Sequence, residues 1–471
     1  MLSINKIKTA YFSGIGGIGV SAIAKIWLKL DKKIRGSDPV SSEIIKDLKE
    51  RGVKIYPQPS KNHISKGVDI LIYSPAVPFN NPERVRAREL KIPEMSYPEV
   101  LGEISKEKKT IAISGTHGKS TTTALIGLIL TAAKIDPTVI VGSQVKSFGW
   151  DGNLRLGKSK YFVAEACEYR AHMLNINPRG IVLTNLEADH LDYYKDLNDI
   201  IKHFEKFVLR LPKGGLLVYN SDNSGCRKLL NVNLKNKLKK LGIKIFDYGL
   251  LTSDHCYAKN IEIKNGKQYF EIIYQKKSLG RFTLAVPGEF NIYNALAAVC
   301  LSLQFGVKKE IIKKVLNNYH GIWRRFEIVG KLKNKIVISD YAHHPTAVKN
   351  TIQATKEYYP NKKLLVVFQP HHHNRTKKLF KEFLECFNDL TKNDLLILNE
   401  IYDVTGREEN KDQNISSKNI VKKLTNKNFS SLYSKDLNCT KKLILKKVKD
   451  FDVVLIMGAG DVDSVAREIV N

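Results

Sequence analysis

The sequence predicts an α/β protein of three domains, each built around a mainly parallel sheet. The chain has 471 residues, which corresponds to roughly three domains at about 150 residues each. Short apolar segments alternate along it with glycine loops and helical segments. This alternation is typical of parallel sheets whose faces are covered by helices. Two of the glycine loops directly follow an expected strand, where such sheets bind their ligands.

The first unit is a Rossmann-like segment that begins close to the N-terminus. Its expected strands span 9–13, 33–36 and 69–74, with helical segments between them. The polar stretch 102–109, GEISKEKK, interrupts the apolar pattern and is predicted to be a linker. The first domain is therefore expected to cover residues 1–106.

Two further units follow. In the second, strands are expected at 110–114, 161–164, 181–184 and 215–219, before a β-rich stretch at 255–287 and a helix at 291–304. In the third, which begins near Ile322, strands are expected at 335–339, 364–368, 394–398 and 453–457. We therefore predict a central domain with a parallel sheet at 107–321 and a C-terminal Rossmann-like domain at 322–471.

The composition departs from the average mainly in charge. There are 77 lysines and arginines against 47 acidic residues, a formal net charge of +30. Such an excess favours a polyanionic partner, which could be nucleic acid, a membrane surface or a phosphorylated small molecule. No basic–aromatic cluster typical of nucleic-acid modules occurs, and no apolar run approaches the ~20 residues that span a bilayer. We therefore expect no nucleic-acid partner and no membrane insertion.

The N-terminus and the cysteines predict where the protein works. The chain opens without the pattern of a secretory signal peptide and soon reaches its first strand. Its six cysteines are scattered and include no CxxC pair, which indicates reduced thiols rather than a disulfide framework. We therefore expect a cytoplasmic protein.

The first glycine loop has the pattern G-x-G-x-x-G at Gly14, Gly16 and Gly19. Glycines at such positions permit a tight turn and let the backbone approach a diphosphate at the N-terminus of the following helix. Asp38 follows 19 residues after the last glycine, as in a dinucleotide-binding fingerprint. By itself the loop leaves three interpretations open: an NAD-type dinucleotide, another nucleotide diphosphate, and a purely structural turn.

The second glycine loop is a stronger signal. Its Gly118-Lys119-Ser120 core lies between an expected strand and an apolar helix. In such loops backbone N–H groups cradle phosphates, the lysine reaches the β- and γ-oxygens, and the hydroxyl ligates Mg²⁺. The first glycine of the full phosphate-loop pattern is absent, because position 113 is isoleucine. We predict an ATP site here, and two phosphate loops in one chain argue against a simple dehydrogenase.

Six motifs are spread over nearly the whole chain. They are GTHGKSTTT at 115–123, EACE at 165–168, TNLEADHLD at 184–192, GEFNIYNA at 288–295, RRFE at 324–327 and DYAHHPT at 340–346. In sequence and in order they resemble the motifs of the Mur ligases, the amino-acid-adding enzymes of peptidoglycan synthesis. The chain is identified as a member of that family on this pattern.

Within the family, the opening GIGGIG loop, DYAHHPT and the QPH segment at 369–371 resemble the branch that joins L-alanine to UDP-N-acetylmuramate. The branch that attaches a recycled murein tripeptide shares much of this pattern and is the alternative. The resemblance implies two steps. The muramate carboxylate attacks the γ-phosphate of ATP to give an acyl phosphate, and the amine of alanine then displaces phosphate. The implied partners are ATP, UDP-N-acetylmuramate and L-alanine, with Mg²⁺ as cofactor.

For ATP, the resemblance implies contacts from the second glycine loop, the 291–304 helix and the C-terminal domain. Lys119 is expected to bind the β- and γ-phosphates and Arg325 to reach the γ-phosphate from the C-terminal side. Together with His190 they are the expected catalytic residues. The expected ATP set is Gly115, Thr116, His117, Gly118, Lys119, Ser120, Thr121, Asn291, Asn294, Arg325 and Asp340.

Two asparagines of this set share a helix face because they lie three residues apart, at 291 and 294. Side-chain amides can read the donors and acceptors of an adenine edge, whereas helix N-capping is the alternative role for Asn291. Asp340 resembles the residue that holds the ATP ribose.

The resemblance implies that Ser120, Glu165 and His190 ligate Mg²⁺. Because Mg²⁺ prefers oxygen, the histidine rests on the resemblance alone, and its alternative role is packing at the N-terminus of the next helix. Glu168 is a weaker candidate. Its motif departs from the family pattern at Cys167 and Arg170, where that pattern has acidic residues.

With the family in view, the first glycine loop is expected to hold the UDP diphosphate rather than NAD. The expected UDP-substrate set is Gly14, Gly16, Gly17, Gly19, Ser37, Asp38 and Ser74. His343, His344 and Arg375 are expected near the muramate and alanine. His372 stands where this branch usually has arginine. Three consecutive histidines at 371–373 rarely converge on one metal ion, since neighbours on a strand face opposite ways.

Two other function classes remain as alternatives. An NAD-dependent oxidoreductase would account for the first loop and Asp38 but leaves the second loop unused. A basic nucleic-acid-binding ATPase would account for the net charge and predicts steeply salt-dependent binding.

Overall fold

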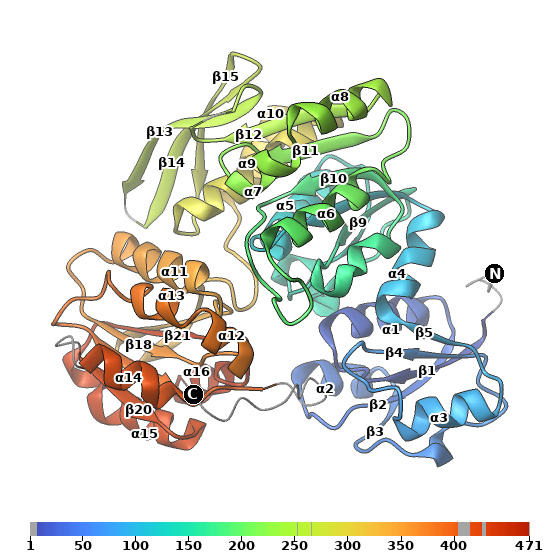
Figure 1. The fold of residues 1–471 in the computed structure, drawn as a ribbon, viewed down its shortest axis with the longest axis horizontal. Coiled ribbons are helices and arrows are strands. Elements are labelled where there is room, and N and C mark those ends of the chain that lie inside the picture. Colours follow the sequence, from blue (N-terminus) through green and yellow to red (C-terminus); the bar gives the residue numbers. More distant parts are fainter. Residues whose placement is uncertain (1–6, 252, 265, 404–414, 426–429, 471) are drawn as a thin grey trace.

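The computed structural model describes residues 7–470 except 252, 265, 404–414 and 426–429. Within these residues the strands form three separate sheets of five, ten and six strands. Each sheet uses one continuous part of the chain, 9–96, 109–284 and 327–457, and Figure 1 shows the three units as separate bodies along the colour ramp. The predicted α/β class is confirmed. The domain boundaries after 106 and 321 remain a proposal, and each sheet lies inside one of the proposed ranges.

The first sheet is fully parallel, with strand order β3-β2-β1-β4-β5. Its strands are β1 (Thr9–Ser13), β2 (Lys33–Ser37), β3 (Lys54–Tyr56), β4 (Ile70–Tyr73) and β5 (Glu94–Ser96). Its helices are α1 (Ile18–Lys29), α2 (Glu43–Glu50), α3 (Pro82–Glu89) and α4 (Tyr97–Lys106). The chain reverses its direction of travel across the sheet between β1 and β4, so the first glycine loop lies at a ligand-binding switch point.

The predicted linker at 102–109 is wrong. Residues up to Lys106 continue α4, and β6 already begins at Lys109. The helix buries Gly102 and Ser105 against the segment around Asn175, where a Cβ on Gly102 would lie 2.6 Å from the Asn175 carbonyl oxygen. The polar residues that suggested a linker lie mainly on its outer side.

The second sheet is parallel in the middle and antiparallel at both ends, with the order β15-β14-β13-β12-β11-β10-β6-β9-β7-β8. Its strands are β6 (Lys109–Ser114), β7 (Thr138–Ile140), β8 (Leu154–Arg155), β9 (Tyr161–Glu165), β10 (Pro178–Leu183), β11 (Leu216–Asn220), β12 (Lys244–Gly249), β13 (Cys256–Lys264), β14 (Lys267–Tyr274) and β15 (Lys277–Leu284). Its helices are α5 (Lys119–Ala132), α6 (Leu197–Val208), α7 (Ser224–Leu229), α8 (Val232–Lys240), α9 (Glu289–Gln304) and α10 (Lys309–Asn317). The apolar helices α5 and α9 pack on each other over the sheet.

The third sheet has the order β16-β17-β21-β18-β19-β20, with only the β16–β17 pair antiparallel. Its strands are β16 (Glu327–Leu332), β17 (Lys335–Asp340), β18 (Leu364–Phe368), β19 (Leu395–Asn399), β20 (Ser431–Ser434) and β21 (Val453–Met457). Its helices are α11 (Pro345–Tyr358), α12 (His373–Lys378), α13 (Phe380–Glu385), α14 (Ser417–Thr425), α15 (Leu437–Lys447) and α16 (Asp463–Ile469). Short 3₁₀ segments occupy Lys61–His63, Lys146–Asp151, Tyr169–Asn175 and Val448–Asp450. None of the helices described in the chain is both long and apolar enough to cross a membrane.

A polar network joins the first domain to the central one. The ammonium of Lys25 on α1 is buried and contacts the Asp47 carboxylate at 2.9 Å and the Asp151 carbonyl oxygen at 3.0 Å. Arg51 donates to both Asp47 and Asp151 at 2.8 Å. Because charged groups this deeply placed need partners, the network fixes how α1 meets the central domain.

Gly19 is required by packing rather than by backbone conformation. A Cβ there would lie 2.5 Å from the ring of Tyr97, which packs against the core at the start of α4. We expect Gly19→Ala to destabilise the first domain by about 1–3 kcal/mol through overpacking. Gly67→Ala is the control, because its Cβ would meet no atom within 4 Å. Chemical unfolding followed by tryptophan fluorescence measures both; equal effects would contradict the packing argument.

Candidate active site

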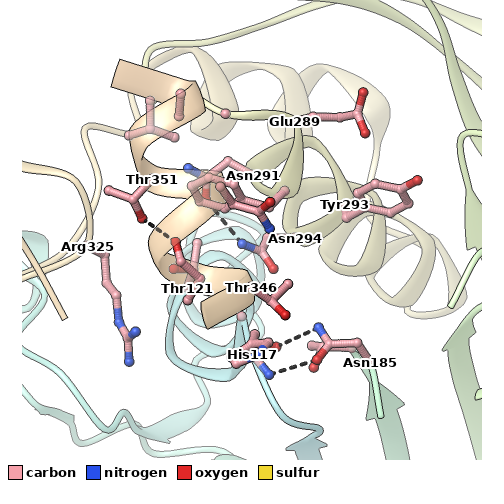
Figure 2. Close-up of a pocket in the computed structure, with 18 of the residues that line it drawn as sticks. His117, Thr121, Asn185, Glu289, Asn291, Tyr293, Asn294, Arg325, Thr346 and Thr351 are labelled. Carbon is pink, nitrogen blue, oxygen red and sulfur yellow. Dashed lines mark hydrogen bonds between the residues drawn. The ribbon is translucent and has the colours of Figure 1, made fainter. Parts of the chain in front are cut away.

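A cavity of about 380 Å³ lies between the central and C-terminal domains. Figure 2 shows its walls: the loop before α5, the first turns of α9, and side chains of the C-terminal domain such as Arg325 and Thr346. Eight residues of the expected ATP set line it, namely His117, Gly118, Ser120, Thr121, Asn291, Asn294, Arg325 and Asp340. The fold therefore gathers most of that set from three distant parts of the chain. The other three, Gly115, Thr116 and Lys119, do not line the cavity wall.

The loop between β6 and α5 has a shape that only glycine permits at two points. Gly115 and Gly118 have φ of 137° and 80°, which L side chains rarely adopt. A Cβ would lie 2.2 Å from Thr184 Oγ1 at the first and 2.3 Å from Asn294 Oδ1 at the second. The side chain of Asn185 also pairs with the backbone N–H and C=O of His117, at 2.8 and 3.1 Å (Figure 2). The loop is thus held by the end of β10 and by α9.

Lys119 folds back over its own loop. Its ammonium donates to the carbonyl oxygens of Gly115 and Thr116 at 2.6 and 3.0 Å and contacts the Glu168 carboxylate at 2.9 Å. Burial alone would lower the lysine pKa, but the nearby Glu168 carboxylate raises it above its ordinary value. Lys119 is therefore a charged group with three protein partners, and a phosphate must compete with them.

Glu168, the weaker candidate of the sequence, lies at the centre of this arrangement. It is buried and bridges Lys119 to His190, whose Nε2 is 3.4 Å from Glu168 Oε1. Burial favours the neutral acid, yet Lys119 and His190 lower the pKa of Glu168 to about 2. The Cys167 and Arg170 departures obscured this role in the sequence, because they removed the family's acidic pattern around it.

The three residues expected to ligate Mg²⁺ follow three neighbouring strands. In the order β10-β6-β9, His190 comes after β10, Ser120 after β6, and Glu165 ends β9. Glu165 accepts a hydrogen bond from the Gly142 N–H at 2.8 Å, and Ser120 Oγ lies 3.5 Å from an Arg325 nitrogen. Their metal role remains a prediction.

Asn291 and Asn294 do share a face and contact each other. Asn294 Nδ2 donates to Asn291 Oδ1 at 3.1 Å, and Asn291 Nδ2 donates to the Pro287 carbonyl oxygen at 2.7 Å. The capping alternative for Asn291 is wrong, because α9 begins at Glu289 with Gly288 as its N-cap. Both side chains line the cavity, so adenine recognition remains a prediction.

The neighbouring arginines at 324 and 325 diverge. Arg324 donates to the carbonyl oxygens of Gly458 and Gly460 inside the C-terminal domain, whereas Arg325 lines the cavity. Asp340 accepts from the N–H groups of Phe326 and Ala342 at 2.6 and 2.7 Å, which fixes the loop that carries Arg325. Burial raises the Asp340 pKa.

The central and C-terminal domains meet through the 184–192 motif, and we call this contact the closure interface. Arg375 forms an ion pair at 2.9 Å with Asp189, which is buried. Thr346 donates to Glu187 at 3.0 Å, and His344 Nε2 is 3.3 Å from the Ala188 carbonyl oxygen. Arg375 and His344, expected near the muramate and alanine, are thus both engaged in closing the domains.

His343 and the histidines at 371–373 of the C-terminal domain lie together, with the ring centroids of His343 and His371 5.8 Å apart. His343 is bound through Nδ1 to the Tyr341 carbonyl oxygen at 2.9 Å. His372 and His373 both face Asp403, whose carboxylate lies 2.6 Å from His373 Nδ1, while the ring of His371 stacks on Tyr402.

The first glycine loop satisfies many of its own N–H groups. Those of Gly14 and Ile15 donate to the Ser37 carbonyl oxygen, and that of Gly16 donates to Asp38 at 2.8 Å. Asp38 thus holds the loop, and burial raises its pKa. The first-turn N–H groups of α1 lack intrahelical partners and are the better donors for a diphosphate.

Glu83 is a buried residue that sequence reasoning missed. Its carboxylate accepts hydrogen bonds from Tyr11, Ser13 and Ser37 at 2.7, 2.5 and 2.7 Å. Ser13 and Ser37 end β1 and β2, so Glu83 aligns two strand ends beside the glycine loop. Only the spatial approach of α3 to these strands reveals this role. Ser74 lies on the other side, 2.9 Å from a Cβ built on Gly14.

His344 makes stability depend on pH. Burial and then the neighbouring His117 lower its pKa from 6.5 to about 4. As the pH falls, the unfolded chain therefore takes up a proton at this histidine at a higher pH than the folded protein does. The contribution to stability that is present above pH 6.5 is lost as the pH falls toward 4. We expect the titration of this residue to lower the free energy of unfolding by about 2 kcal/mol between pH 7 and pH 5. Urea unfolding of the wild type and His344→Asn at both pH values measures it; equal pH slopes would refute the assignment.

Comparison with known proteins places this geometry in a family. Family models match at residues 9–109 (Mur ligase family, catalytic domain), 113–302 (Mur ligase middle domain) and 324–460 (Mur ligase, glutamate ligase domain). A UDP-N-acetylmuramate–L-alanine ligase of Clostridium kluyveri is 40% identical over 469 residues, covering 99% of this chain and 98% of the relative.

Two solved structures share the three-domain fold. A UDP-N-acetylmuramate–alanine ligase of Thermotoga maritima aligns with a TM-score of 0.83 at 27% identity over 98% of both chains. A murein peptide ligase of Psychrobacter arcticus aligns over 98% of both chains with a TM-score of 0.73. At 22% identity this match shows a shared fold alone. With 40% identity to a curated relative along its whole length, the chain belongs to the Mur ligase family, in the group of the UDP-N-acetylmuramate–L-alanine ligases.

Proposed function

We propose that this chain joins L-alanine to the carboxylate of UDP-N-acetylmuramate at the expense of ATP, through an acyl phosphate, in peptidoglycan precursor synthesis. The observation that carries the proposal is the cavity between the domains. It brings the phosphate loop and Asn291 and Asn294 against Arg325 and Asp340 of the C-terminal domain. A site of this kind assembles only when the two domains meet, as a reaction that must exclude water requires.

Transfer of the γ-phosphoryl group to the carboxylate requires alignment of the reacting groups and neutralisation of their charge more than it requires an acid or a base. Lys119 belongs to the phosphate loop, and Arg325 of the C-terminal domain reaches the same loop at Ser120, 3.5 Å away, so two positive charges can meet the γ-phosphate. Lys119 is held back by Glu168 at 2.9 Å and must exchange that carboxylate for phosphate oxygens. The pair therefore keeps the lysine charged and near the loop until ATP arrives.

The residues present fit a Mg²⁺ site. Ser120 and Glu165 supply the oxygen donors that Mg²⁺ prefers, and they follow the adjacent strands β6 and β9. His190 is oriented by Glu168. When bound, Mg²⁺ neutralises charge on the phosphates. Ser120 and Glu165 are the primary ligands in this proposal, and His190 is the third.

The first domain is proposed to bind the UDP part of the substrate at the switch point between β1 and β4. Gly14, Gly16, Gly17, Gly19, Ser37, Asp38 and Ser74 surround this point. Gly14, with a φ of 74°, lets the loop turn closely, while the N-terminus of α1 faces the diphosphate. We place the enzyme in the cytoplasm, because ATP and nucleotide sugars are found there.

The alternatives are less well supported. Tripeptide ligation is favoured by structural neighbours at 22% and 24% identity, against 40% for a curated L-alanine ligase. An NAD-dependent oxidoreductase would need Asp38 for a ribose, but its two oxygens bind the N–H groups of Gly16 and Val40.

Phosphate release in the presence of ATP, Mg²⁺ and UDP-N-acetylmuramate tests the amino-acid substrate directly. We expect release to depend on free L-alanine. If alanine has no effect while the tripeptide restores release, the recycling activity is the correct one.

Removing the lysine of the phosphate loop should stop the reaction. We expect Lys119→Ala to lower kcat by at least about a hundredfold, because a charge that meets the transferring phosphoryl group is lost. Lys202→Ala, on the exposed face of α6, is the matched control and should keep full activity. A fully active Lys119→Ala would overturn the site.

Glu168 is expected to act by positioning Lys119 and His190. Glu168→Gln keeps the shape and removes the charge, so we expect kcat to fall by about 10–100-fold. The KM for ATP should stay the same or fall, because the phosphates no longer compete with a carboxylate for Lys119. Steady-state kinetics separate the two constants, and a rise in KM with an unchanged kcat would contradict this role.

A further inference from the structure

A group of potential metal ligands lies at the closure interface, apart from the set expected to bind Mg²⁺. It consists of His117, Glu187 and His344, whose ligand atoms all lie within 4.8 Å of one another. His117 precedes α5, Glu187 follows β10, and His344 is the N-cap of α11. Two members thus belong to the central domain and one to the C-terminal domain.

The imidazole nitrogens of this group are weakly used by the protein. Nε2 of His117 is buried and has no hydrogen-bond partner among the described residues. Buried polar atoms are normally paired. The carboxylate of Glu187, however, lies 3.6 Å from this nitrogen, which is too far for a hydrogen bond. His344 makes only long contacts, 3.3 Å to the Ala188 carbonyl oxygen and 3.4 Å to the Thr346 N–H.

The local structure nevertheless holds the three side chains in place. The backbone of His117 is fixed by Asn185 at 2.8 and 3.1 Å, and Glu187 accepts from the Thr346 hydroxyl at 3.0 Å. Figure 2 shows His117 on the phosphate loop next to Thr346 at the start of α11. An unpartnered buried imidazole nitrogen is therefore aimed at a fixed carboxylate and a second imidazole.

We propose that His117, Glu187 and His344 bind a transition-metal cation of the Zn²⁺ class across the closure interface. Two imidazoles and one carboxylate form a donor set typical of Zn²⁺, whereas Mg²⁺ prefers oxygen. Small side-chain rotations bring the donors to the ~2.0–2.2 Å that such ions require. Because the ligands come from both domains, the bound ion fastens the phosphate loop to the C-terminal domain. This site stands independently of the proposed function.

Zn²⁺ alone is the probe, added to the full-length, metal-stripped protein without nucleotide. Competition with a chromophoric chelator is expected to show one tight Zn²⁺ that excess Mg²⁺ does not displace, and Co²⁺ in its place should give the visible bands of a low-coordinate nitrogen–oxygen site. We expect Glu187→Gln and His344→Asn each to weaken Zn²⁺ binding by more than about tenfold. Glutamine keeps an acceptor for Thr346, and asparagine keeps a helix cap.

Two control variants separate this site from others. His203→Asn removes a histidine of α6 outside the group, and Glu165→Gln disables the expected Mg²⁺ site; both should retain the tight Zn²⁺. Thermal unfolding confirms that each variant is folded, and if one is not, the other ligand variant decides. Tight binding that survives in His344→Asn, or that is lost in Glu165→Gln, would show that the ion sits elsewhere and would overturn the proposal.

Discussion

The buried ion pair between Lys119 and Glu168 is the interaction on which the candidate site depends. Neither side chain would remain charged without the other, because an unpaired buried charge lowers stability by several kcal/mol. Glu168 lowers that cost for Lys119 and at the same time reaches His190 at 3.4 Å. One carboxylate therefore links the phosphate loop after β6 to the loop after β10.

The closure interface extends this order into the C-terminal domain. The loop after β10 carries Glu187 and Asp189 as well as His190, and these acids contact Thr346 and Arg375 across the interface. The same short segment thus faces the phosphate loop on one side and the C-terminal domain on the other. The segment therefore links the phosphate loop to the C-terminal domain, alongside the direct contacts of Arg325 with Ser120 and of His344 with His117.

Much of the fold and part of the site could be predicted from local patterns. The strands at 9–13, 161–164, 364–368 and 453–457 are continuous apolar runs, and their boundaries match the structure to within a residue or so. The helix at 102–106 could not be predicted, because GEISKEKK is polar on its outer side and the contact of Gly102 with Asn175 is tertiary. Glu83 was missed for the same reason, since its partners Tyr11, Ser13 and Ser37 lie at least 46 residues away.

The sequence by itself determined the three-domain α/β class, the phosphate loop and the family, because glycine spacing and strand–helix alternation are local properties that need no partner. Only the tertiary structure decided which side chains meet. Burial selected Glu168 over its neighbours by placing it between Lys119 and His190, and the carboxylate of Asp38 holds the first glycine loop. Domain contact brought Glu187 and His344 to His117, an arrangement that depends on the relative position of two domains. That position is fixed by the summed contacts of an interface rather than by any one motif.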